Sequence, residues 1–350
     1  IKRPNFQYTL QFQGDIKNGL FYSLGGAIEK NHLYGVAGQT RIGLTYLPVL
    51  PSPRRFHGTR LRFSVATGVQ EPSLAAEFSS LYSELEQSGN QDAITAYQVT
   101  PLGPERSRTY DLGVEQNILG QKLIVKAGYF HNQFNHQIEV VDSNGLTQYF
   151  GIPPTIADQL YGAALNSLAF RAQGMELEVQ YHPLTHVLLR GGYTYLAPLV
   201  LQSFASDAVA ANNGMPTTNP NLPGIPIGAL SPLVGSRPFR RPPQTGFFAA
   251  QYLSHRFSAA IKGALASRSD DSTFQLDNDF SGGNTLLLPN RNLDFGYAKL
   301  DANALYALTG RITVFTQLDN LLSQQHIGPI GYPSLPFTIR AGFKIRIGGN

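Results

Sequence analysis

Apolar and polar residues alternate along most of the 350-residue chain. The segment TIRAGFKIRI at 338–347 shows the pattern plainly, because its odd-numbered positions are Ile339, Ala341, Phe343, Ile345 and Ile347. A period of two places successive side chains on opposite faces of a β-strand. The pattern therefore predicts a strand with one entirely apolar face.

Similar segments recur throughout the chain and predict about thirteen strands of about ten residues each. The predicted strands cover residues 5–13, 19–30, 36–47, 59–69, 107–117, 121–131, 172–182, 186–196, 244–254, 256–266, 296–308, 310–320 and 337–347.

Short and long connections alternate between these strands. Tight turns are expected at GDIKN, NILGQ, HPLT, LSHR and LTGR, and long connections at 70–106, 132–171, 197–243, 267–293 and 321–336. Near the start of the chain, NHLYG is a brief loop on the long side and PVLPSPRRFHG a longer one on the short side. Tight turns at one rim and long loops at the other are typical of an outer-membrane β-barrel. We therefore predict an all-β, antiparallel, up-and-down transmembrane β-barrel with its apolar face towards lipid.

Two long connections also contain apolar residues at helical spacing. These segments, 73–85 and 155–168, predict short helices at the rim. A soluble propeller or solenoid would also contain many short strands. Such folds repeat one structural unit at a nearly constant number of residues. The loops of this chain differ too much in length for such a repeat, which argues against these folds.

Composition agrees with a strand-rich and turn-rich chain. Charged residues make up 14%, and the chain has 35 Gly, 23 Pro, 17 Tyr, 21 Phe and no Cys. The lack of Cys excludes disulfides, thiolate metal sites and cysteine nucleophiles. The net charge is +4, but the basic residues are dispersed, so nucleic acid is not an expected partner. No apolar stretch is long enough for a membrane-spanning helix.

Several stretches resemble the C-terminal barrel of TonB-dependent outer-membrane receptors. The similar stretches are GVQEPSLAAEF (68–78), PERSRTYDLGVEQNI (104–118), AGYFHNQFNHQIE (127–139), RAQGMELEV (171–179) and LDNLLSQQHIGPIGYP (318–333). The chain departs from the family pattern where Asp319 replaces a Glu and where Ile347 replaces the C-terminal aromatic residue.

The resemblance implies that the strands are the last thirteen of a 22-stranded barrel. An odd strand count points the same way, because a closed bacterial barrel has an even number. Residues 1–350 are thus expected to be one partial barrel domain without its N-terminal plug, in the bacterial outer membrane. The implied function is TonB-dependent import of a scarce ligand such as an iron chelate, cobalamin, haem or an oligosaccharide. A passive porin-like or adhesive barrel is the alternative, and an upstream plug would distinguish the two.

Charged residues on the polar faces of neighbouring strands predict a ladder of ion pairs in the lumen. A turn at NILG would set Glu115 opposite Lys122 and Asp111 opposite Lys126. A PLT loop would set Glu178 opposite Arg190. These pairs are expected to be structural, because neighbouring acids neutralise the bases.

The candidate ligand-binding residues are arginines near the outer rim. Arg237, Arg240 and Arg241 end the long 197–243 connection, and Arg340 lies on the polar face of the last strand. Guanidinium groups suit carboxylate and phosphate, so an anionic small molecule is the preferred ligand, with lipopolysaccharide phosphate as the alternative. Lipid and lipopolysaccharide are the expected membrane partners, and the TonB complex would be reached through a plug.

Catalytic and metal chemistry are not expected. The histidine spacing does not suit a metal site, and no catalytic motif of defined geometry occurs. We therefore expect a transporter rather than an enzyme, with no metal and no cofactor.

Overall fold

The computed structural model describes residues 5–17, 19–50, 56–160, 162–204, 234–235, 237–238, 241–267, 296–324 and 334–347. In these residues, thirteen antiparallel strands form one sheet in strict sequence order. The strands are β1 (Asn5–Ile16), β2 (Leu20–Asn31), β3 (Gly35–Val49), β4 (Phe56–Gln70), β5 (Glu105–Ile118), β6 (Leu123–Asp142), β7 (Gly162–Leu184), β8 (Val187–Gln202), β9 (Gln244–Leu253), β10 (Phe257–Ala266), β11 (Tyr297–Ala307), β12 (Ile312–Asp319) and β13 (Thr338–Ile345).

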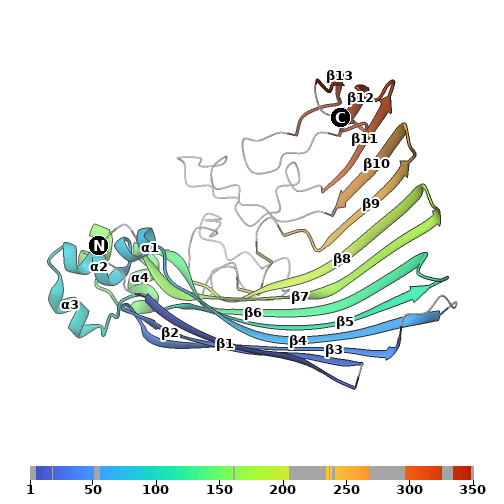
Figure 1. Cartoon of the computed structure of the whole chain (residues 1–350). Helices are drawn as coiled ribbons and strands as arrows, with labels where there is room; N and C mark the ends of the chain where they lie inside the picture. Colours follow the sequence, from blue (N-terminus) through green and yellow to red (C-terminus); the bar gives the residue numbers. More distant parts are fainter. Residues whose placement is uncertain are drawn as a thin grey trace.

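The sheet curls like part of a barrel wall, with β1 and β13 as its two edges (Figure 1). All thirteen predicted strands are confirmed. Five short helices lie at one end of the sheet, and several tight hairpins lie at the other (Figure 1). They are α1 (Leu74–Phe78), α2 (Leu81–Gln87), α3 (Gln91–Ala96), α4 (Ser143–Phe150) and α5 (Pro154–Leu160). No helix in the described ranges is long and apolar enough to cross a membrane.

One face of the sheet carries mainly apolar side chains in every strand. Strand β1 is the clearest example, since Phe6, Tyr8, Leu10 and Phe12 are each more than half exposed and alternate with glutamine and threonine. At the other edge, Ile339, Phe343 and Ile345 of β13 are also more than half exposed. No protein layer covers these side chains in the described residues, so this face requires an apolar surrounding such as lipid.

Two expected segments are corrected by the structure. The predicted connection 132–171 is largely strand, because β6 continues to Asp142 and β7 begins at Gly162. The predicted helix 155–168 ends at Leu160. Alternation is obscured here because β-bulges interrupt the register after Phe134 and because Val141, Ala163 and Ala164 are buried against helices.

Both predicted register assignments are wrong. Lys126 pairs with Glu115, while Asp111 lies opposite Phe130. The turn is centred on Gly120, with positive φ at Leu119, Gly120 and Gln121, and Lys122 belongs to it. A turn centred two residues later shifts the strand pairing by four residues.

In the next hairpin, Arg190 pairs with Gln180 rather than with Glu178. The strands close at Leu184 and Val187, and an irregularity follows Tyr181. The turn thus lies later in the chain than PLT, and the irregularity reduces the resulting shift of the pairing to two residues. A shift of the pairing by an even number of residues keeps each side chain on the same face of its strand. The charged side chains therefore still share the polar side of the sheet.

Candidate functional site

A row of alternating charges crosses the polar face through four neighbouring strands. Arg60, Glu115, Lys126 and Glu178 lie directly opposite one another in the registers of β4 to β7. Arg60 Nη1 lies 3.5 Å from Glu115 Oε1, and Lys126 Nζ lies 3.7 Å from Glu178 Oε2. Opposite charges on facing strands attract, so the row favours this register.

Arg190 of β8 extends the row. Its Nη2 donates to Glu178 Oε1 at 2.9 Å, although the two residues are diagonal rather than opposite in register. Glu178 therefore contacts one cation on each side. The side chains are partly exposed, so each pair contributes on the order of 0.2–1 kcal/mol.

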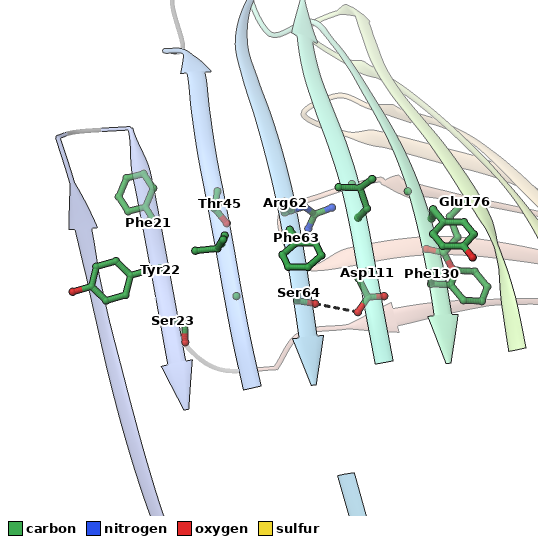
Figure 2. Close-up of a pocket in the computed structure, with 16 residues that line it drawn as sticks. Phe21, Tyr22, Ser23, Thr45, Arg62, Phe63, Ser64, Asp111, Phe130 and Glu176 are labelled. Carbon is green, nitrogen blue, oxygen red and sulfur yellow. Dashed lines mark hydrogen bonds between the residues drawn. The ribbon is translucent and has the colours of Figure 1, made fainter. Parts of the chain in front are cut away.

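An open hollow of about 480 Å³ lies over β2 to β7 beside this row. Most of its lining residues share the polar face, among them Thr45, Arg62, Ser64, Asp111 and Glu176 (Figure 2). The Ser64 hydroxyl donates to Asp111 Oδ2 at 3.1 Å, drawn as the dashed line in Figure 2. The hollow thus presents hydroxyl, guanidinium and carboxylate groups to the lumen side.

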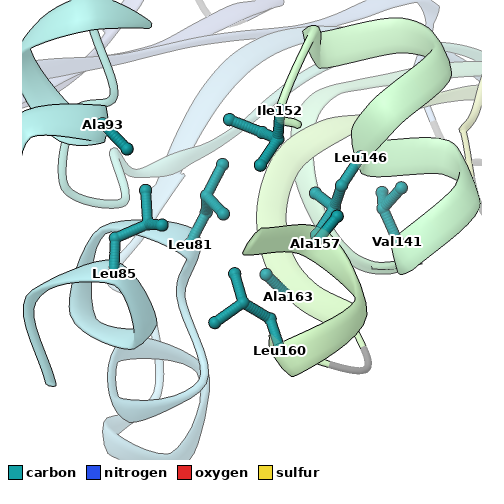
Figure 3. Close-up of a cluster of buried hydrophobic side chains, with 9 residues drawn as sticks. All are labelled: Leu81, Leu85, Ala93, Val141, Leu146, Ile152, Ala157, Leu160 and Ala163. Atoms are coloured by element: carbon teal, nitrogen blue, oxygen red, sulfur yellow. The ribbon is translucent and has the colours of Figure 1, made fainter. Parts of the chain in front are cut away.

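The helices at the long-loop end pack together as a small apolar unit, called the helical cap below. Its buried core contains Leu81, Leu85, Ala93, Val141, Leu146, Ile152, Ala157, Leu160 and Ala163 (Figure 3). The Ser73 and Ser80 hydroxyls cap α1 and α2, and Asp142 Oδ1 accepts from Gly145 N at the start of α4. This core joins the β4–β5 connection to the β6–β7 connection, and Ala164 N of β7 donates to Ser79 O at 2.7 Å.

Glu139 of β6 ties a third connection to this end of the sheet. Its Oε1 accepts from Ser167 Oγ at 2.6 Å and from Phe204 N at 2.9 Å. Its Oε2 accepts from Ser203 Oγ at 2.6 Å. The chain after β8 is thereby fixed against β6 and β7, and the Phe204 ring contacts the rings of Tyr149 and Phe150 in α4.

Two tyrosines of the long-loop end have raised pKa values. Burial raises the pKa of Tyr34, and the Glu29 carboxylate adds to the rise by accepting a 2.6 Å hydrogen bond from the Tyr34 hydroxyl. Burial also raises the pKa of Tyr149 in α4, with a further contribution from the charge of Asp142. The Tyr34 phenol is therefore a neutral hydrogen-bond donor to Glu29.

Asn320 anchors the last connection. Its backbone adopts φ 53°, its amide N donates to Asp301 Oδ1 at 2.8 Å, and its Nδ2 donates to Gln324 O and Leu335 O. The adjacent Asp319 accepts from Arg340 Nη2 at 2.8 Å. The shorter Asp of this chain, where the resembled motif has Glu, thus still reaches the facing strand.

The structure places Arg340 in β13 and places Arg237 and Arg241 before β9. Arg340 and Asp319 line a hollow of about 560 Å³ at the outer ends of β11 to β13, which also includes Lys299. Arg237 and Arg241 are exposed before β9. Arg240 lies outside the described residues.

Sequence reasoning missed the helical cap as a joint unit, the Glu139 contacts and three arginines of the apolar face, Arg106, Arg108 and Arg171. The arginines could have been found by following the parity of the predicted strands beyond Tyr110. Glu139 gave no comparable signal, because its partners are about 30 and 65 residues away in the sequence.

An open barrel wall with an apolar outer face, a charged inner face and long loops at one rim defines a β-barrel protein of the bacterial outer membrane. Residues 5–321 match the family model described as TonB dependent receptor-like, beta-barrel. The chain belongs to this family.

Solved structures share this fold. The ferric-catecholate import receptor Fiu from K12 E. coli aligns with a TM-score of 0.62 and 13% identity, over 98% of this chain and 44% of that chain. The ferripyoverdine receptor of the outer membrane of Pseudomonas aeruginosa gives 0.62 and 12%, over 98% and 38%. The ferric citrate transporter FecA gives 0.56 and 14%, over 98% and 45%. No curated protein matches the sequence. The chain thus spans less than half the length of these structures.

Proposed function

We propose that this chain forms part of the barrel wall and outer rim of a receptor that imports a scarce ligand across the outer membrane with energy from TonB. The family match over residues 5–321 carries the proposal. The charged polar face and the ordered helical cap support it, because a ligand receptor needs a polar lumen and loops held at its mouth. The relatives' names point to a ferric chelate as the first ligand class to test.

The test is uptake by cells that express the full-length receptor. Ferric chelates, cobalamin, haem and oligosaccharides are compared in strains with and without TonB, at equal surface expression. Uptake of one class that disappears without TonB is the expected result. Uptake that is the same in both strains would instead favour a passive porin-like barrel, and adhesion without uptake an adhesive one.

We further propose that the ligand is anionic and contacts arginines at the outer rim. Arg340 lines a hollow at the outer ends of β11 to β13, where an incoming ligand would arrive. Its guanidinium also forms an ion pair with Asp319. Arg237, Arg240 and Arg241 would add positive charge near the start of β9. Replacing Arg240 and Arg241 by Ala is expected to weaken binding at unchanged surface expression, and unchanged affinity would contradict it. Lipopolysaccharide phosphates are the alternative anions for these rim arginines.

The charge row has a structural role in this proposal. Its cations are paired with Glu115 and Glu178, which leaves little net positive charge to attract a ligand. The chain is proposed to act without catalysis and without a resident metal or cofactor.

A further inference from the structure

The apolar face carries an asymmetric set of charges. In the regularly paired parts of the described strands, its charged side chains are Lys30, Arg106, Arg108 and Arg171. All four are basic and lie towards the long-loop ends of β2, β5 and β7. Asp and Glu are absent from the same described part of this face. The chain as a whole has nearly equal numbers of the two signs, 27 basic and 23 acidic residues, whereas this described part of the face carries basic residues alone.

On the apolar face of β5, β6 and β7, the side chains become more polar from row to row towards the long loops. The row Leu112, Tyr129 and Met175 is apolar and well exposed. The next row towards the long loops is Tyr110, His131 and Gln173, in which His131 Nδ1 lies 3.1 Å from Gln173 Oε1 and the Tyr110 and His131 rings meet edge to face. The row after that is Arg108, Gln133 and Arg171.

This sequence of rows follows the profile of a lipid leaflet. Apolar side chains suit acyl chains, amphipathic side chains suit the interface, and guanidinium groups suit phosphate. Four residues separate Leu112 from Arg108, which is about 14 Å along a strand and about 10 Å along the membrane normal at a tilt of about 40°. When the Leu112 row lies in the hydrocarbon region, the arginine backbones lie about 10 Å nearer to the headgroups, and the long arginine side chains extend further towards them.

Arg108 and Arg171 both lie opposite Gln133, one on each neighbouring strand. Strand spacing places their backbones about 10 Å apart, a gap that two long arginine side chains can close around one phosphate group. Arg108 is exposed, and the buried Nε of Arg171 has no hydrogen-bond partner in the described residues. This row thus contains a guanidinium N–H group without an acceptor among the described residues.

We propose that Arg108 and Arg171, with Gln133 between them and Arg106 one row further out, bind the phosphorylated headgroup of an outer-leaflet lipid. The site differs from the rim arginines considered above, because it lies on the lipid-facing side and not at the mouth of the lumen. It depends on the outer-membrane location and not on the identity of the transported ligand.

The test uses the full-length receptor in detergent micelles and fluorescent lipid A as the probe. Bisphosphorylated lipid A is compared with the same lipid after removal of its phosphates, and inorganic phosphate is added as a competitor. The wild type is expected to bind the phosphorylated form at least about tenfold more tightly. Inorganic phosphate alone is expected not to displace it, because the acyl chains contribute through the apolar rows.

The R108Q/R171Q variant is expected to bind the phosphorylated lipid as weakly as the dephosphorylated one. R108K/R171K should keep more of the affinity, and R311Q, at an exposed arginine of the short-turn rim, should keep all of it. Heat-modifiable migration on gels shows that each barrel is folded, and R108Q alone serves if the double variant does not fold. Equal binding of wild type and R108Q/R171Q, equal binding of both lipids, or full displacement by inorganic phosphate would overturn the proposal.

Discussion

Glu139 and Ser203 are joined by a 2.6 Å hydrogen bond between a carboxylate Oε2 of β6 and a fully buried hydroxyl just after β8. The same carboxylate also accepts from Ser167 and from the backbone of Phe204. One acceptor residue therefore holds together two strands and the start of the longest connection. An acid at this place organises the outer rim, because its two oxygens accept from β7 and from the chain after β8 at the same time.

Glu139→Gln should release the chain after β8. The amide presents a donor where the native group accepts, so part of the contact set is lost at a cost of about 1–3 kcal/mol. Hydrogen exchange at residues 203–204 is expected to rise about tenfold or more, with little change in β9 and β10. Glu86→Gln, at an exposed position of α2, is the matched control. Unchanged exchange in Glu139→Gln would show that the contact does not fix this segment.

Leu85→Ala should open the helical cap without unfolding the barrel. Leu85 is fully buried in the cap core, so truncation is expected to cost about 2–5 kcal/mol of local stability. Amides of α2 to α5 should exchange faster, while the heat-modifiable migration of the barrel stays the same. Leu74→Ala, at a residue 45% exposed in α1, should have little effect. Equal exchange in the two variants would contradict a packed cap.

The β5–β6 register can be tested by cross-strand disulfides, since the chain has no Cys of its own. The pair E115C with K126C should oxidise readily, because directly opposite residues have Cα atoms about 4.5–5.5 Å apart. The pair D111C with K126C should not, because four residues of offset separate these positions along the strands by more than about 10 Å. Crosslinking of the second pair in preference to the first would restore the register expected from the sequence.

A charge on the apolar face should be costly in the middle of the band and tolerated at its outer edge. Leu112→Arg places a guanidinium in the exposed apolar row and is expected to cost about 2–4 kcal/mol in folding into lipid vesicles. Val36→Arg, opposite Lys30 near the long-loop end, should cost about 0–1 kcal/mol. Urea titrations in vesicles measure both. Similar costs for the two variants would mean that this face does not contact lipid along its length.

The alternation of side chains determined the strands and their two faces. The thirteen predicted strands all occur, and Ile339, Phe343 and Ile345 lie on an exposed apolar face as expected. This was possible because the period of two is a property of each strand alone. Lipid favours the same alternation in every strand, so the apolar face can be predicted without knowing which other part of the protein would pack on it.

Tertiary structure alone decided the register and the organisation of the outer rim. Glu115 faces Lys126 because the backbone of Leu119, Gly120 and Gln121 turns later than the sequence suggested, and an alternating pattern looks the same after any even shift. The extension of β6 and β7 was hidden because Val141 and Ala163 are buried by the helical cap and not by lipid. Glu139 meets Phe204 across 65 positions of the chain, and such a contact forms only when distant connections are brought to the same rim.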